Sequence, residues 1–267
     1  MGPEEISKAV SEVVERVVRR LEDSTHGELS SAADERLFAE QRARLQQAVA
    51  EGACRLVPQG LSLDQCGDLA PMIERTLLRP DARDADVRDL CRDAAERRLA
   101  SVCVNLEWVE AASETLRNSR VLLSVPVGFP AGGISTEGKC AEIRRALSLG
   151  ADEADVVLNI ARLMAADYRA VAEDLWTCVR AAQGRPVKAV IHLAELTQEQ
   201  KIAAAILSKA AGAKFVKSST GFGPDGVTVG DVALIRTALA GQTLPAAKPE
   251  WPARVGAVIC LEASPGR

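Results

Sequence analysis

The sequence has few aromatic residues, no marked excess of either charge and no long hydrophobic run. Four Phe, three Trp and one Tyr in 267 residues are too few to build the stacking platforms that bind single-stranded nucleic acid. The 33 basic and 37 acidic residues nearly balance, which argues against the basic surface that nucleic acids and anionic membranes require. No stretch approaches 18 uninterrupted apolar residues. We therefore expect neither a nucleic-acid partner nor a membrane.

Cysteine and histidine do not form a recognisable metal or redox motif. The seven cysteines are irregularly spaced without a C-x-x-C pair, and the two histidines are isolated. The first 23 residues lack the apolar core of a secretory signal. These features predict reduced thiols, no metal site and a cytoplasmic location. A hydrophobic fraction of 47% is ample for a core and excludes an intrinsically disordered chain.

The first 68 residues differ in pattern from the rest and are expected to form a helical extension, followed by an α/β barrel over 69–267. Apolar residues recur every three or four positions over 6–21, which is typical of an amphipathic helix. A second helical stretch is expected over 32–51. The extension either packs on the barrel, mediates association of two chains, or binds a partner through the face that carries Val10, Val13, Val14 and Val17.

Beyond residue 70, short apolar runs alternate with longer helical patterns, which predicts βα units and a parallel sheet. The expected strands are 100–104, 121–125, 153–158, 187–191 and 214–217. The expected helices are 84–98, 107–117, 136–149, 167–182, 197–211 and 228–240. No G-x-G-x-x-G turn follows the first strand, so a TIM (β/α)8-type barrel is favoured over a doubly wound sheet.

Lys188 and Lys217 each lie inside an apolar strand, where burying an ammonium group is costly unless it is paired or neutral. Two such lysines on neighbouring strands predict a depressed pKa, a neutral amine and attack on a carbonyl to form a Schiff base. The alternative is that each side chain reaches solvent at a strand end. Asp155 lies in the middle of another run and is expected to act either as an acid–base group through a water or as a salt-bridge partner of Lys188.

From residue 73 to about 239 the sequence resembles deoxyribose-phosphate aldolase, a class I aldolase family built on a TIM barrel. The matching segments keep the family's order and spacing: ERTLLRP (74–80), ASVCVN (100–105), VGFPAG (127–132), GADEADVVLNI (150–160), VKAVI (187–191) and GAKFVKSSTGF (212–222).

The resemblance implies a role for each matching residue. Lys217 corresponds to the Schiff-base lysine, Asp155 to the acidic residue of the proton relay and Lys188 to the supporting lysine. Cys103, Thr76, Thr220 and Gly221 correspond to positions around the substrate. The implied reaction is the reversible cleavage of 2-deoxyribose 5-phosphate to acetaldehyde and glyceraldehyde 3-phosphate, without a metal or an organic cofactor. Its partner is then a small aldehyde or sugar phosphate.

The sequence departs from the family pattern at several positions. The family has IDHTLLKP where this chain has residues 73–80, and a Glu-Thr pair where it has His192 and Leu193. The family's seventh strand carries G-x-K-x-x-G-G; here Lys248 is a possible second lysine without the glycine pair, and 255–260 is a possible seventh strand with Glu262 near the lysine's place.

We therefore expect a barrel that is incomplete at strands 7 and 8. Its exposed strand edges would be covered by the extension or by a second chain in a homodimer. An alternative function is a catalytically impaired or non-catalytic aldolase-like protein with a binding or assembly role.

Overall fold

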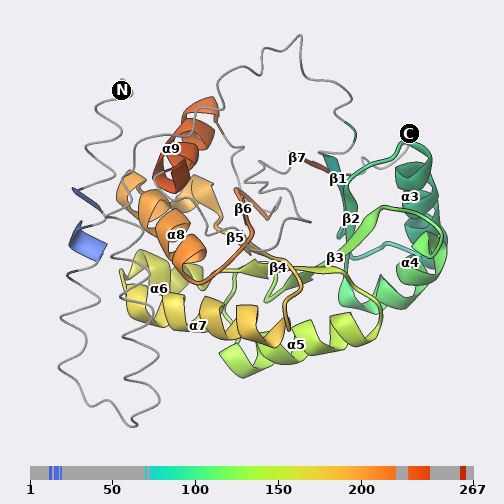
Figure 1. Cartoon of the computed structure of the whole chain (residues 1–267), viewed down its shortest axis with the longest axis horizontal. Coiled ribbons are helices and arrows are strands. Elements are labelled where there is room, and N and C mark those ends of the chain that lie inside the picture. Colours follow the sequence, from blue (N-terminus) through green and yellow to red (C-terminus); the bar gives the residue numbers. More distant parts are fainter. Residues whose placement is uncertain are drawn as a thin grey trace.

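The structure is a computed structural model that describes residues 12–13, 15–17, 19, 70, 73–220, 228–240 and 259–262. Within these ranges β-strands and α-helices alternate along the chain, as the sequence pattern predicts. Figure 1 shows the strands in a curved row with the helices outside the curve. No helix in these ranges is long and apolar enough to cross a membrane.

Seven parallel strands form one curled sheet in the order β6-β5-β4-β3-β2-β1-β7. They are β1 (Ile73–Leu77), β2 (Ser101–Val104), β3 (Leu122–Val127), β4 (Glu153–Val157), β5 (Val187–Val190), β6 (Phe215–Lys217) and β7 (Ile259–Glu262). Five predicted strands are confirmed. The structure adds β1, and it places the last strand beside β1, where the final strand of a closed barrel would pair, rather than beside β6. In the described ranges the barrel is therefore open between β6 and β7.

The connections between the strands are helical, and the six predicted helices are all present. The α-helices are α3 (Asp84–Glu96), α4 (Val109–Leu116), α5 (Thr136–Ser148), α6 (Ile160–Met164), α7 (Tyr168–Ala181), α8 (Gln198–Ala210) and α9 (Val229–Ala240). The short 3-10 helices η4 (Leu106–Trp108) and η5 (Leu193–Glu195) precede α4 and α8. Gly150 and Gly212 follow α5 and α8 with φ of +105° and +93°, the left-handed ending predicted there.

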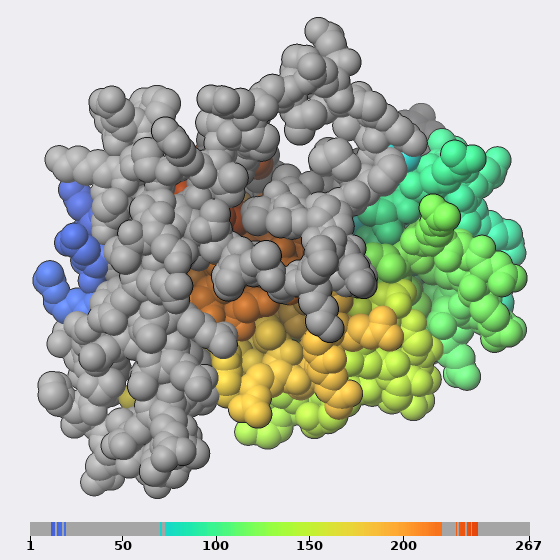
Figure 2. Space-filling view, in the orientation of Figure 1, coloured from blue at the N-terminus to red at the C-terminus, as the bar shows by residue number. Residues whose placement is uncertain are grey.

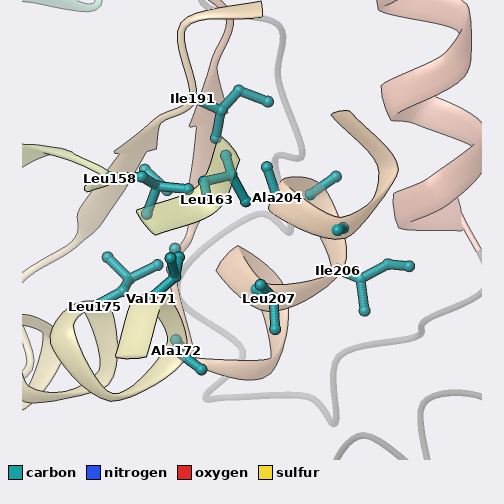
Figure 3. Close-up of a cluster of buried hydrophobic side chains, with 14 of the residues drawn as sticks. Leu158, Leu163, Val171, Ala172, Leu175, Ile191, Ala204, Ile206 and Leu207 are labelled. Atoms are coloured by element: carbon teal, nitrogen blue, oxygen red, sulfur yellow. The ribbon is translucent and has the colours of Figure 1, made fainter. Parts of the chain in front are cut away.

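The outward-facing residues of the strands pack against these helices and form the hydrophobic core. Residues of β1 to β3 join α3 and α4 in one cluster, and residues of β4 and β5 join α5, α7, α8 and α9 in another. Figure 3 shows part of the second cluster, in which side chains of α7 and α8 meet Leu158, Leu163 and Ile191. The helices thus cover the outside of the sheet and leave its inner face for the site.

The inner face of the sheet is polar because strand residues alternate between the two faces. On β1, Arg75 pairs outward with Asp93 of α3, whereas Glu74 is fully buried on the other face. The buried polar or thiol side chains of the inner face are Glu74, Thr76, Ser101, Cys103, Ser124, Glu153, Asp155, Lys188 and Lys217. Charged and hydroxyl groups are therefore gathered from six neighbouring strands into one place.

Most of the predicted extension over 1–68 and the predicted helix over 32–51 lie outside the described residues. The described part of the first helix has the predicted amphipathic pattern. Val13 and Val17 are buried and belong to the same cluster as residues of α7 and α8. Arg16 faces outward and pairs with Glu199 of α8 at 3.3 Å. In the space-filling view this short segment lies at one edge of the molecule, and the coloured surfaces of α5 and α7 form the lower rim (Figure 2).

Candidate functional site

Lys217 lies at the end of β6 and is held between two carboxylates. Its Nζ donates to Asp155 Oδ2 at 2.5 Å and to Glu74 Oε1 at 2.5 Å, so the contacts come from β4 and β1. Only 6% of Lys217 is exposed. The prediction that Lys217 and Asp155 come together is confirmed, and the alternative that this lysine reaches solvent is wrong.

Lys188 lies beneath Lys217 and is paired with three carboxylates. Its Nζ contacts Glu74 Oε2, Glu153 Oε2 at 2.8 Å and Asp155 Oδ1 at 3.3 Å. Burial lowers the pKa of Lys188, but these three negative charges outweigh burial and raise it above its ordinary value. The depressed pKa predicted for this lysine is therefore wrong: Lys188 is a fixed positive charge, and the predicted salt bridge to Asp155 is present.

Asp155 is the group that connects the two lysines. Besides its contacts with both ammonium groups, its Oδ1 accepts a hydrogen bond from Ser124 Oγ at 2.5 Å, and its Oδ2 lies 3.7 Å from Cys103 Sγ. Burial alone would raise the pKa of this carboxyl. The charges of Lys188 and Lys217, with the Ser124 hydrogen bond, instead hold it well below its usual range. Asp155 is therefore a carboxylate at any physiological pH.

Cys103 and Thr76 lie next to each other on β2 and β1, where their Cα atoms are partners in the register. Burial raises the pKa of the Cys103 thiol well above its ordinary value, so it remains protonated. The Thr76 hydroxyl is buried and has no hydrogen-bond partner among the described residues. A buried hydroxyl without a partner is costly. Thr76 is therefore a candidate for a substrate contact.

Glu74 and Glu153 were not singled out by the sequence analysis, yet each contacts Lys188. Glu74 also contacts Lys217 and accepts from Ser101 Oγ at 2.8 Å. Burial raises the pKa of Glu153, although its contact with Lys188 opposes the shift. Glu74 stands where the resembled family has an aspartate. Its place opposite that aspartate in the matching segment 74–80 was the signal that could have identified it.

The inner face therefore holds two ammonium groups and three carboxylates in mutual contact. Glu74, Cys103 and Asp155 also place three possible metal-ligand atoms within 4.8 Å of one another. Both carboxylates already contact ammonium groups, which supply the positive charge that a metal ion would bring. The arrangement suits amine and acid–base chemistry.

Thr220 lies three residues beyond Lys217, the last residue of β6. Its Oγ1 is 3.1 Å from Nδ1 of His192, which follows β5, and both residues are buried. Gly221 and Lys248, the other predicted positions, lie outside the described residues. The described site residues thus lie at the inner face or at the C-terminal end of the strands, where TIM-barrel enzymes carry their active sites.

Comparisons with known proteins agree on one family. Residues 62–249 match the family model described as DeoC/LacD family aldolase. A protein named deoxyribose-phosphate aldolase from Clostridium perfringens is 44% identical over 169 residues, which are 63% of this chain and 75% of that protein. One of the same name from Streptococcus sanguinis is 42% identical over 164 residues, which are 61% and 74%.

The fold comparison points to the same group. The tetrameric deoxyribose phosphate aldolase from Aeropyrum pernix superposes with a TM-score of 0.60 at 28% identity. The match covers 74% of this chain and 79% of that chain.

Proposed function

The chain belongs to the DeoC/LacD family of aldolases, and on this basis we propose that Lys217 is the Schiff-base residue of a deoxyribose-phosphate aldolase. Relatives with that name are 42–44% identical, so the chain is a carbon–carbon lyase that acts on a small molecule. The proposed substrate is 2-deoxyribose 5-phosphate, and the products are acetaldehyde and glyceraldehyde 3-phosphate.

The observation that carries the proposal is the position of Lys217 against Asp155 and Glu74. Each carboxylate oxygen is 2.5 Å from Nζ, within reach for proton transfer. A lysine must lose a proton before its lone pair can attack an aldehyde. Glu74 is the second carboxylate that contacts Nζ, and we assign it to accept this proton, which leaves Asp155 to act on the substrate. Its other oxygen remains bonded to Lys188.

The proposed reaction balances without any further reagent. The Lys217 lone pair attacks C1 of the open-chain sugar, and loss of water gives an iminium ion. Asp155, through a water, removes the proton from the C3 hydroxyl. The C2–C3 bond breaks, its electron pair enters the iminium to form an enamine, and glyceraldehyde 3-phosphate leaves. Protonation at C2 and addition of water then release acetaldehyde and regenerate the amine.

The remaining predicted residues are assigned to binding and charge balance. Lys188, the register partner of Asp155 on the neighbouring strand β5, holds the Asp155 carboxylate in its ionised state and in a fixed direction. The Thr76 hydroxyl and the Cys103 thiol border the place where the two-carbon fragment would lie beside Lys217. Thr220 would contact the sugar phosphate at the mouth of the barrel.

Borohydride trapping tests the proposal directly. Incubation with acetaldehyde and borohydride should add an ethyl group to Lys217, which peptide mass spectrometry locates. K217R should lose both the adduct and deoxyribose-phosphate cleavage. K214R is the matched control, because Lys214 is exposed three residues upstream and should leave both unchanged. An adduct absent from Lys217 in the wild-type chain would refute the assignment.

We further propose that the chain acts as a homodimer. The strands β6 and β7 end the sheet in the described part of the chain, and an uncovered strand edge promotes pairing with other chains. The apolar residues Val13 and Val17 pack on the barrel's own cluster. This packing supports the role of the extension over 1–68 as a cover for the barrel rather than as a surface for a foreign partner.

A further inference from the structure

A hydroxyl, an imidazole and a carboxylate form a row at the mouth of the barrel. Thr220 Oγ1 lies 3.1 Å from His192 Nδ1, and His192 Nε2 lies 3.6 Å from Glu195 Oε1. Thr220 and His192 are buried, whereas Glu195 is largely exposed. The mechanism above uses neither His192 nor Glu195.

The backbone holds this row in place beside the reactive lysine. Val190 is the register partner of Lys217. His192 follows Val190 by two residues, so His192 lies closer than Lys217 to the mouth of the barrel, where the strands end. Beyond the strands, Leu193 N donates to Ser218 O at 2.8 Å and ties the two loops together.

The backbone of His192 is itself unusual. It has a φ of +48° and a ψ of +60°, in the left-handed region that side-chain-bearing residues rarely adopt. A non-glycine residue held there next to a reactive group commonly serves the site.

The neighbours of the ring select one arrangement of protons. The Glu195 carboxylate lies on the Nε2 side and favours a proton on that nitrogen. Nδ1 then carries the lone pair and accepts a hydrogen bond from the Thr220 hydroxyl group. A threonine oxygen has two lone pairs in addition to its proton. With its proton directed to the imidazole, Thr220 presents an acceptor, and this suits a substrate hydroxyl group as the donor.

We propose that His192 is a positioning residue that directs the Thr220 hydroxyl so that its oxygen accepts a hydrogen bond from a hydroxyl group of the sugar phosphate. The proposal rests on the aldolase function proposed above. It also gives a function to a position at which this chain departs from the resembled family, which has glutamate there. Glu195 acts behind His192 by fixing the tautomer.

Steady-state cleavage of 2-deoxyribose 5-phosphate tests the proposal with variants that suit the left-handed backbone. H192G removes the ring, and H192N keeps a hydrogen-bonding atom near the position of Nδ1; glycine and asparagine both tolerate positive φ. H192G and T220V should each raise KM about five- to tenfold with kcat within about twofold, because one hydrogen bond to substrate is lost. H192N should recover most of the affinity. E195Q, altered at an exposed position, should raise KM about two- to threefold.

The combined variant and the trapping reaction separate this proposal from others. The KM of H192G/T220V for 2-deoxyribose 5-phosphate should be no higher than that of T220V, because both changes remove the same contact. Acetaldehyde trapping at Lys217 should be unchanged in every variant. Wild-type KM in H192G and E195Q, equal loss in H192N and H192G, or multiplied effects in the double variant would each overturn the positioning role. Failure of trapping in the wild-type chain would instead overturn the proposed function.

Discussion

At the scale of single residues, Thr76 combines a stability cost with a proposed binding role. Its hydroxyl is buried without a partner among the described residues, and such a group costs about 1–3 kcal/mol. T76V should therefore raise the free energy of unfolding by about 1 kcal/mol and raise KM for the sugar phosphate several-fold. Urea denaturation and steady-state kinetics measure the two effects. T76S keeps the hydroxyl and should leave KM nearly unchanged, although the loss of a buried methyl group lowers its stability. A T76V variant that is less stable with unaltered KM would contradict the assignment.

The lowered pKa of Asp155 predicts a specific dependence of the free energy of unfolding on pH. Its pKa is lower in the folded chain than in the unfolded chain, so its ionisation stabilises the fold above the unfolded pKa of about 3.9. This contribution is lost as pH falls toward the folded value. Between pH 4 and pH 3 the free energy of unfolding of the wild-type chain should fall by up to about 1 kcal/mol more than that of D155N. Urea denaturation at each pH measures both values. Parallel pH curves for the two proteins would show that the carboxyl is not stabilised as described.

The contrast between Asp155 and Glu74 shows what residue patterns can predict. Asp155, Lys188 and Lys217 were found because each interrupts an apolar run that reads as a buried strand. Because these strands were expected to be neighbours in a parallel sheet, the three side chains were expected to contact one another. Glu74 was overlooked as a site residue because charges at both positions 74 and 75 hide the strand pattern of β1. Only the structure shows that one of these charges faces α3 and the other faces the two lysines.

The charge state of the site could not be derived from the sequence either. Two lysines on neighbouring strands were expected to lower each other's pKa. The number of carboxylates around them depends on which strand residues face inward in the folded sheet, and three carboxylates reverse the shift for Lys188.

At the scale of elements, a buried ion pair joins α5, α7 and the end of β4. Lys139 Nζ donates to Asp174 Oδ2 at 2.6 Å and to the Val157 carbonyl at 2.8 Å, and Thr136 donates to the other carboxylate oxygen. K139M should lower the free energy of unfolding by about 3–5 kcal/mol because it leaves a buried carboxylate unpaired. Chemical denaturation measures the loss.

The double variant K139M/D174L is the matched control for this pair. Replacing both members by apolar residues removes the unpaired charge and should recover most of the stability. Equal stability of K139M and the wild-type chain would show that the pair is not buried in solution. A double variant less stable than K139M would show that Asp174, through its hydrogen bond from Thr136, stabilises the packing of these elements even without the lysine.

Helices of two or more turns were predictable, whereas the short helix α6 and the pairing of distant strands were not. Helices such as α3 and α7 follow from apolar residues at three- and four-residue spacing, and their ends agree within about two residues. The five-residue helix α6 has too few turns to show a period. The pairing of β7 with β1 is a contact between distant segments, which no local pattern reports.

At the scale of the whole molecule, the open sheet predicts association. In a parallel pair the peptide groups of one strand alternate in direction, and the carbonyl of Lys217 in β6 accepts a hydrogen bond from Ile191 N, which follows β5. The Phe215 amide, two residues earlier, therefore also faces β5, and the Val216 amide faces the side of β6 away from β5, where the described part of the chain supplies no strand. A second copy on this side would bury the edge next to Lys217 and complete the wall of the site.

Light scattering after size exclusion should give about twice the 28.4 kDa of one chain. Hydrogen exchange at the Val216 amide should slow as protein concentration rises through the dimerisation range, because the second copy then covers the edge. The Phe215 amide faces β5 and serves as an internal control whose exchange should not depend on concentration. A chain that stays at 28.4 kDa at high concentration, with concentration-independent exchange at Val216, would mean that its own residues cover β6.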